Sequence, residues 1–196
     1  MSKSIVLATN NNDKVKEIRA ILADVPVELL PLSGFENVPE MIEDGETLNE
    51  NALIKARIIF HHFKMPVLAD DTGLEVFSLG GQPGVYSARY AGEHATYADN
   101  RHKLLHELNG KTEREAQFRC TAAFIDANNE KTFEGICPGR IIETERGNEG
   151  FGYDPIFIPD GFDKTFGELP HDVKNRISHR AKAFVEVKKF LIDYLK

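Results

Sequence analysis

The stretch that decides the fold of this chain is IVLATNNNDK, from Ile5 to Lys14. Its first four residues form a short apolar run, which is typical of a buried strand. Beyond the polar residues, Val15, Ile18 and Leu22 recur at helical spacing, so the stretch predicts a strand, a polar turn and a helix. Because the first N–H groups of a helix lack intrahelical partners, they attract anions. The turn therefore predicts an anion site.

Two later stretches add groups that a polyphosphate requires. ADDTG, from Ala69 to Gly73, places acid at the end of an apolar run, where a metal ion can bind. ISHR, from Ile177 to Arg180, supplies cations late in the chain. With the lysine of the first stretch, these groups would hold a polyphosphate bridged by a divalent ion. The three stretches together predict a phosphate site, which none of them predicts alone.

The composition restricts the class of protein. A chain of 196 residues is long enough for one domain, or two closely joined lobes, with a hydrophobic core. The net charge of -7 argues against a nucleic-acid-binding protein with a general basic surface. No apolar run has the length of a signal segment or a membrane-spanning helix, so we expect a cytoplasmic protein without a membrane partner. The cysteines, Cys120 and Cys137, lack CxxC spacing and are expected to be free thiols.

Capping and apolar runs predict the next elements. Thr47-Leu48-Asn49-Glu50 matches a capping box, which predicts a helix from about Leu48 to Phe63. Pro66 to Ala69 predicts a buried strand that ends at Asp70-Asp71. A turn at Thr72-Gly73 is expected to follow, and then more extended chain.

The second half of the chain favours hairpins. Leu104 to Leu108 marks a helix, and the alternating residues Phe118 to Phe124 predict a strand. A turn at Asn128-Asn129 leads to a second strand at Thr132 to Cys137, which makes a hairpin. Apolar residues between Ala181 and Leu191 recur at helical spacing and predict a terminal helix.

These elements predict an α/β fold with a mixed, curved β-sheet flanked by helices. We expect a single domain, residues 1–196, in which two lobes enclose a central substrate cleft. The segment Gly80 to Gly84 is expected to be a loop, because its glycines and proline interrupt both regular periods.

The polar turn of the first stretch has two interpretations. Motifs of the forms G-x-x-x-x-G-K-[ST] and G-x-G-x-x-G do not occur, so a standard phosphate loop and a dinucleotide fingerprint are excluded. The turn would bind phosphate through a hydroxyl, amides and one ammonium, supplied by Thr9, Asn10, Asn11, Asn12, Asp13 and Lys14. The alternative is an asparagine-rich helix cap without a ligand. Asp13 favours this alternative, because its carboxylate suits the helix dipole but repels phosphate.

Lys55 and Glu43 are candidates for the same site. Lys55 shares the apolar helix face of Leu48, Ala52 and Ile59, so it points inward and needs a partner. The alternative is a lysine that extends its ammonium to solvent at the edge of the core. Glu43 precedes this helix closely enough to return toward its start, but charge patterning alone favours a solvated acidic loop.

Asp70 and Asp71 place acid where an apolar strand ends, a position at which open α/β sheets bind ligands. Neighbours on a strand point to opposite faces, so only one of the two would face a cleft unless the backbone turns. An Asx-turn onto Gly73 would explain one aspartate without chemistry. Magnesium favours carboxylate and phosphate oxygens, so the pair is a candidate metal site.

The late cations and aromatic residues have structural alternatives as well. Ser178 is a candidate helix cap, and His179 and Arg180 would then stand in a first helical turn, where positive charge is unfavourable. That cost indicates a ligand, although a basic surface cluster including Lys174 is the alternative. Phe151 stands between glycines as a candidate stacking surface, and its alternative is a core aromatic beside a bend.

With these residues assembled, the chain resembles the inosine triphosphate pyrophosphatase family, also called XTP/dITP diphosphatases. The resemblance spans nearly the whole chain. It rests on six ordered motifs, T-x-N-x-x-K at Thr9 to Lys14, E-D-G-E-T with E-N-A between Glu43 and Ala52, A-D-D-T-G at Ala69 to Gly73, the segment Gly80 to Tyr90, F-G-Y-D at Phe151 to Asp154 and S-H-R at Ser178 to Arg180. It implies an α/β homodimer that hydrolyses 6-oxo purine nucleoside triphosphates to the monophosphate and pyrophosphate.

The resemblance also implies residue roles. It implies a metal site for Mg2+, with Mn2+ as a substitute, held by Glu43 and Asp71, and Asp71 as the catalytic proton acceptor. It implies a substrate-binding set of Thr9, Asn10, Asn11, Asn12, Asp13, Lys14, Lys55, Thr72, Phe151, Gly152, Tyr153, Asp154, Lys174, His179 and Arg180. Within that set, Phe151 would stack on the purine, and His179 with Arg180 would approach its 6-oxo edge.

Other function classes remain as alternatives. A nucleotide-sensing protein would retain the site without turnover, and a magnesium-dependent phosphatase would release orthophosphate instead of pyrophosphate. A single-stranded RNA-binding module would use Phe151 and Tyr153 for stacking, but the acidic charge balance disfavours it.

Overall fold

The computed structural model describes residues 3–196 of the chain. The chain divides into two compact units. Unit 1 comprises residues 1–71, 120–135 and 180–196, and unit 2 comprises residues 72–119 and 136–179. The expectation of one domain, residues 1–196, stays a prediction.

The strands form a mixed sheet in the order β2-β1-β3-β5-β6-β7, with β4 paired to β3. β1 (Lys3–Leu7) is parallel to both of its neighbours, β2 (Val27–Pro31) and β3 (Val67–Val76). β5 (Glu115–Ile125) and β6 (Glu130–Ile141) are adjacent in the sheet and are joined by a short turn, as the predicted hairpin requires. Parallel and antiparallel pairs occur together, which confirms the predicted mixed α/β class.

The helices of unit 1 begin where their sequence signals indicate. α1 (Asn12–Ile21) has Asn11 as its N-cap, whose side chain accepts hydrogen bonds from the N–H groups of Asp13 and Lys14. α2 (Leu48–Phe63) begins with the predicted capping box between Thr47 and Glu50. α5 (His179–Tyr194) is the predicted terminal helix, and all but its first residue belong to unit 1.

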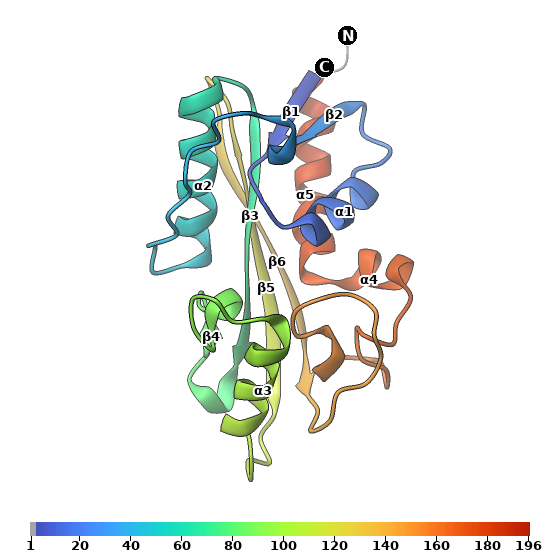
Figure 1. Ribbon diagram of the computed structural model, residues 1–196. Coiled ribbons are helices and arrows are strands. Elements are labelled where there is room, and N and C mark those ends of the chain that lie inside the picture. Colours follow the sequence, from blue (N-terminus) through green and yellow to red (C-terminus); the bar gives the residue numbers. More distant parts are fainter. Residues whose placement is uncertain (1–2) are drawn as a thin grey trace. The chain divides into compact units, whose positions relative to one another are not determined.

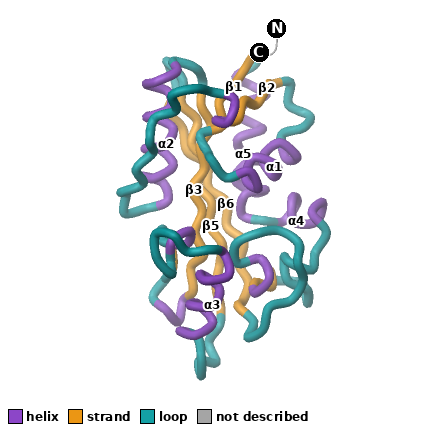
Figure 2. The backbone as a smooth tube through the Cα atoms, viewed as in Figure 1, coloured by secondary structure: helices purple, strands orange, loops and turns teal. Residues whose placement is uncertain are grey.

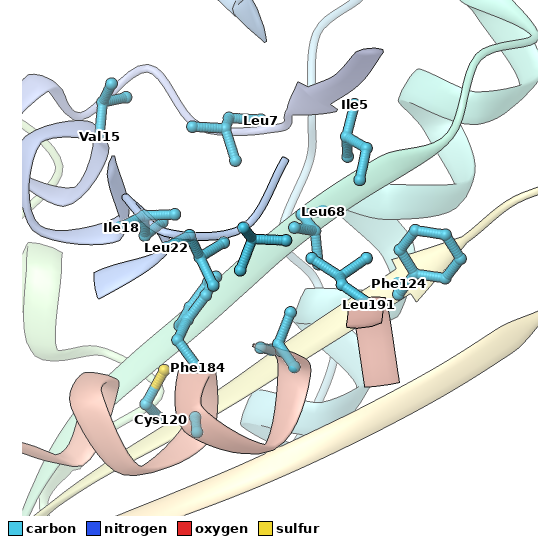
Figure 3. Close-up of a cluster of buried hydrophobic side chains, with 14 residues drawn as sticks. Ile5, Leu7, Val15, Ile18, Leu22, Leu68, Cys120, Phe124, Phe184 and Leu191 are labelled. Carbon is cyan, nitrogen blue, oxygen red and sulfur yellow. The ribbon is translucent and has the colours of Figure 1, made fainter. Parts of the chain in front are cut away.

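One face of the unit 1 sheet packs against α1 and α5. Ile5, Leu7 and Leu68 extend from this face into a buried cluster with apolar residues of both helices, including Ile18 and Phe184. Figure 3 shows these side chains converging from the helices and strands. Because residues of one strand alternate between faces, Ile5 and Leu7 share this side of the sheet.

The opposite face packs against α2. Val6, Val67 and Ala69 form a second buried cluster with Ala52 and Ile59 of that helix. Figure 1 shows α2 on one side of the unit 1 strands and α1 with α5 on the other. Both faces of the sheet are covered, which explains why its central strands are apolar on both sides.

Unit 2 has less regular structure. Its helix α3 (Tyr97–Glu107) and its short helix α4 (His171–Ile177) accompany two short strands, β4 (Pro83–Gly84) and β7 (Phe157–Pro159). Short 3-10 helices are also present: η1 (Leu32–Gly34) in unit 1 and η2 (Phe77–Leu79), η3 (Ser87–Arg89) and η4 (Asp154–Ile156) in unit 2. Much of the chain between β6 and α4 is loop, drawn teal in Figure 2. The core of this unit is rich in aromatic residues, among them Phe118, Tyr153, Phe157 and Phe166.

The structure corrects two sequence predictions. The predicted turn at Thr72-Gly73 is wrong, because β3 continues through both residues to Val76. Pairing with β4, in which Leu74 stands opposite Gly84, keeps the strand extended despite the turn-favouring dipeptide. The predicted loop Gly80 to Gly84 is wrong at its end, since Pro83–Gly84 is strand β4.

Candidate functional site

The uninterrupted strand β3 separates the two aspartates of the ADDTG stretch. Asp70 is two residues after Leu68 on the strand, so its side chain points to the same face of the sheet, the one covered by α1 and α5. Asp71 is two residues after Ala69, so its side chain points to the opposite face, the one covered by α2. Because the strand does not turn, the two carboxylates have different partners, and the Asx-turn explanation does not apply.

On the first face, four charged side chains form the Asp70 cluster, which comprises Lys14, Glu17, Asp70 and Arg180. The Oδ2 atom of Asp70 lies 3.2 Å from the Nζ of Lys14 and 3.1 Å from the Nη2 of Arg180. Arg180 also donates from Nη1 to Glu17 at 2.6 Å. Two carboxylates and two cations balance, so the cluster carries no formal net charge.

Burial makes the pairing in the Asp70 cluster strong. Asp70 and Arg180 are each only 1% exposed. Burial alone would raise the pKa of Asp70, but Lys14 and Arg180 hold it well below its ordinary value. Burial would likewise lower the pKa of Arg180, and Asp70 with Glu17 raises it instead. The cost of a cation in the first turn of α5 is therefore offset by two carboxylates from other segments.

On the second face, three side chains form the Asp71 cluster, which comprises Glu43, Lys55 and Asp71. The Nζ of Lys55 lies 2.8 Å from the Oδ1 of Asp71 and 3.2 Å from the Oε2 of Glu43. Two carboxylates share one ammonium, so the cluster carries a formal charge of about -1 with both acids ionised. The interpretation of Lys55 as a solvent-directed lysine is wrong, because its side chain is only 5% exposed.

The pKa directions in the Asp71 cluster agree with an excess of acid. Burial raises the pKa of Glu43 above its ordinary value, and Asp71 raises it further, although Lys55 opposes both. Burial alone would lower the pKa of Lys55, but Asp71 and then Glu43 raise it. The site therefore favours additional positive charge.

The Asp71 cluster could hold a divalent cation with help from the substrate. Among residues 3–196, no group of three or more His, Cys, Asp and Glu side chains is placed to hold a metal ion. Two carboxylates leave other coordination positions for water and phosphate oxygens, which is the way Mg2+ commonly binds. The donors present therefore fit Mg2+ bound together with a phosphate substrate.

Asn51 holds the segment that carries Glu43. Its Oδ1 accepts a hydrogen bond from the N–H of Gly45 at 2.8 Å, and the side chain is fully buried. A Cβ at Gly45 would lie 2.7 Å from that same Oδ1, so only glycine fits this close approach. Because Asn51 precedes Lys55 by four residues, both lie on one face of α2.

The polar turn before α1 is organised mainly as a helix start. The N–H of Asn11 donates to the Oγ1 of Thr9 at 3.1 Å, and the N–H groups of Asp13 and Lys14 donate to the Oδ1 of Asn11. This arrangement supports the helix-cap interpretation of Asn11. Asn10 and Asn12 are exposed, and the carboxylate of Asp13 pairs at the surface with a neighbouring lysine.

In unit 2, the loop Gly150 to Asp154 forms a second polar centre with α4. The N–H of Phe151 donates to the Oδ2 of Asp154 at 2.7 Å, and Lys174 donates to the same oxygen. The Nζ of Lys174 lies 4.7 Å from the centre of the Phe151 ring. A Cβ at Gly150 would lie 2.0 Å from that carboxylate oxygen, so glycine is required. Phe151 is partly exposed, while Asp154 and Lys174 are buried.

The other predicted substrate contacts, three in unit 2 and one in unit 1, are not part of this polar centre. Thr72 is half-buried on β3, and Tyr153 donates from its hydroxyl to the carbonyl oxygen of Ser87 at 2.9 Å. The ring of His179 stacks on Phe118 at 4.6 Å between centres. Arg180 belongs to unit 1, where it pairs with Asp70.

Sequence reasoning missed several residues of these clusters. Glu17 follows Lys14 by three residues on α1, so helical spacing could have placed it on the same face. Asn51 could have been found by its spacing from Lys55. Arg101, which donates to the carbonyl oxygen of Gly152, gives no local signal, because 51 residues separate the two.

Within residues 3–196, no helix combines the length and the apolar character needed to cross a membrane.

Comparison with known sequences gives a consistent set of relatives. The sequence model of the Ham1 family matches residues 5–190. A protein of Desulfotalea psychrophila named dITP/XTP pyrophosphatase is 50% identical over 189 residues, which are 96% of this chain and 85% of that protein. A protein of the same name from Christiangramia forsetii is 44% identical, over 95% of this chain and 98% of its own length.

Solved structures of Ham1 proteins are similar to this chain as well. A HAM1 protein from Coxiella burnetii superposes with a TM-score of 0.89 at 38% identity, over 97% of this chain and 99% of its own. The Ham1 protein of Staphylococcus aureus gives a TM-score of 0.88 at 39% identity, over 98% and 100% of the two chains.

Proposed function

The chain belongs to the Ham1 family, and we propose that it hydrolyses 6-oxo purine nucleoside triphosphates such as dITP, ITP and XTP to the monophosphate and pyrophosphate. The names of its relatives as dITP/XTP pyrophosphatases support this reaction. The observation that carries the proposal is the Asp71 cluster, in which the carboxylates of Glu43 and Asp71 share the ammonium of Lys55. Such a cluster favours a further cation and provides a base.

In this mechanism, Asp71 takes the proton from the water that attacks the α-phosphorus, and pyrophosphate leaves. A positioned general base of this kind contributes about 10²- to 10⁴-fold to the rate. Lys55 and Lys14 stabilise the negative charge that develops on the phosphate oxygens. Asp70 and Glu17 hold Arg180 and Lys14 in place, so the Asp70 cluster positions cations.

Glu43 and Asp71 would hold Mg2+, or Mn2+ as a substitute. When bound, the ion would neutralise phosphate charge and favour ionisation of the attacking water. The polar turn and the charge of Lys14 would bind the triphosphate, within the set Thr9, Asn10, Asn11, Asn12, Asp13 and Lys14. Of these, Asp13 has the weakest support, because its carboxylate already pairs with Lys16.

In unit 2, the purine would stack on Phe151, beside Asp154 and Lys174. Gly152 and Tyr153 belong to the same loop, and Thr72 and His179 complete the proposed contacts. Selectivity for a 6-oxo group would follow from donors directed at that oxygen. A 6-amino group would then leave donors unpaired, at a cost of roughly 1 to 3 kcal/mol for each.

We further propose that the protein acts as a homodimer, as the family resemblance implies, and that it is cytoplasmic, as the sequence without a signal-length apolar run suggests. Light scattering during size-exclusion chromatography tests this state. A mass of two chains is expected, and a single-chain mass would refute the dimer.

The function is tested by supplying ITP, dITP, XTP or ATP with Mg2+ and identifying both products. We expect pyrophosphate and the monophosphate from the three 6-oxo substrates, little turnover of ATP, and no turnover after removal of divalent ions. Release of orthophosphate would indicate the alternative phosphatase, and binding without any product would indicate a nucleotide sensor. Comparable efficiency with ITP and ATP would refute the proposed selectivity.

A further inference from the structure

Two residues of α3 contact the loop Gly150 to Asp154. The ring of Tyr97 lies 5.9 Å from that of Phe151 between centres, with the planes inclined by 41°. Arg101 donates from Nη1 to the carbonyl oxygen of Gly152 at 2.9 Å. The two residues are four positions apart and therefore lie on one face of the helix. That face of α3 contacts the loop at a ring and at a backbone carbonyl.

Tyr97 and Arg101 each have a neighbour that restricts their position. Thr96 caps α3 in a capping box with Asp99, which fixes the backbone immediately before Tyr97. Arg101 makes an ion pair from Nε to the Oε1 of Glu145 at 2.9 Å, and its side chain is only 15% exposed. The guanidinium therefore combines one hydrogen bond to the Gly152 carbonyl with a close charge contact to Glu145.

The glycines of the loop Gly150 to Asp154 make its backbone costly to order, so contacts from α3 would help to fix it. Gly150 and Gly152 flank Phe151 with φ values of +72° and +61°, and glycine backbones lose the most freedom when they are ordered. Lys174 and Asp154 contact the Phe151 ring and its N–H respectively. Tyr97 adds the aromatic neighbour, at the spacing expected of a favourable ring pair.

We propose that Tyr97 and Arg101 are positioning residues that hold Phe151 ready to receive a purine base. This inference rests on the proposed function, which assigns base stacking to Phe151. Tyr97 acts through the Phe151 ring and Arg101 through the Gly152 carbonyl. Their loss should weaken ligands that carry a base and leave ligands without a base unaffected.

The test compares the variants Tyr97→Ala and Tyr97→Phe by titration calorimetry with inosine monophosphate and, separately, with pyrophosphate, both in Mg2+. We expect Tyr97→Ala to weaken the monophosphate by about three- to ten-fold, the range of an aromatic pair, without changing pyrophosphate affinity. Tyr97→Phe keeps the ring and should bind as the wild type does. The KM for ITP should rise in parallel for Tyr97→Ala, with kcat within about two-fold.

Arg101 is tested in the same way with Arg101→Met, which removes the donor, and Arg101→Lys, which keeps one. The matched control is His106→Gln, an exposed position on the same helix, which should leave both affinities unchanged. Equal losses for both ligands would indicate general damage and would overturn the inference, as would unchanged monophosphate binding in Tyr97→Ala. If the wild type binds the monophosphate but releases no pyrophosphate from ITP, the proposed function fails while these affinities still decide the inference.

Discussion

Asp70 and Asp71 are neighbours in one strand, yet they belong to chemically different clusters. The Asp70 cluster contains two carboxylates and two cations, all at least partly buried, and it is balanced in charge. The Asp71 cluster contains two carboxylates and one lysine, so an excess of acid remains. Because successive residues of a strand point to opposite faces, two adjacent aspartates can belong to one charge-balanced cluster and one acidic cluster.

The largest effect should follow from Asp71→Asn. This change keeps the shape of the side chain but removes the proposed proton acceptor, so kcat for ITP should fall by about 10²- to 10⁴-fold. Affinity for inosine monophosphate should change little. Steady-state kinetics with a calorimetric titration measures both, and near-normal turnover would exclude Asp71 as the base.

Asp70→Asn should instead act mainly on stability. It leaves the buried guanidinium of Arg180 with a single carboxylate, and breaking a buried pair costs about 3 to 5 kcal/mol. Urea denaturation measures this loss. If the variant does not fold, Glu17→Gln tests the same cluster from its less buried partner, with a smaller loss expected. Unchanged stability in both variants would contradict the positioning role.

A smaller effect is expected from Asn51→Ala, which removes the acceptor of the Gly45 N–H. The segment carrying Glu43 then loses one anchor, and the metal affinity should fall by about ten-fold, as is typical when a residue that orients a ligand is lost. The Mg2+ concentration at half-maximal activity and a Mn2+ titration measure the change. Asn49→Ala, exposed in the same helical turn, is the control and should resemble the wild type.

The smallest effect concerns pH, and its sign differs between the clusters. Asp70 has a lowered pKa in the folded protein, so its stabilisation is present above the unfolded value of 3.8 and is lost as the pH falls below it. Glu43 has a raised pKa, so its contribution is present below the unfolded value of 4.5 and is lost as the pH rises through the folded value.

Metal-free urea denaturation between about pH 3 and pH 7 measures the Glu43 contribution and the onset of the Asp70 loss. In Glu43→Gln, the free energy of unfolding should no longer fall as the pH rises, while its decrease at low pH should remain. A Glu43→Gln variant with the same pH profile as the wild type would show that burial does not raise this pKa.

Local signals predicted the elements well, for a physical reason. The capping box of α2 involves Thr47 and Glu50 alone, and the cap of α1 involves Asn11 and the next residues, so each is readable from a few neighbouring residues. The Thr72-Gly73 turn was predicted wrongly because the local preference was overridden by pairing with β4.

The partners of the site residues were harder to predict. The cationic first turn of α5 was interpreted as a sign of a ligand, whereas Arg180 is bound by Asp70 and Glu17, which are 110 and 163 residues away in the chain. Contacts across such separations leave no periodic or capping signal. The same limitation applies to Arg101 and Gly152.

A divalent cation should bind at the Asp71 cluster and not at the Asp70 cluster. Titration of Mn2+ by electron paramagnetic resonance, with the metal-free wild type, Asp71→Asn and Glu17→Gln, tests it directly. Glu17→Gln should bind Mn2+ as the wild type does, while Asp71→Asn should bind it about ten-fold more weakly or worse. Wild-type affinity in Asp71→Asn, or a loss confined to Glu17→Gln, would contradict it.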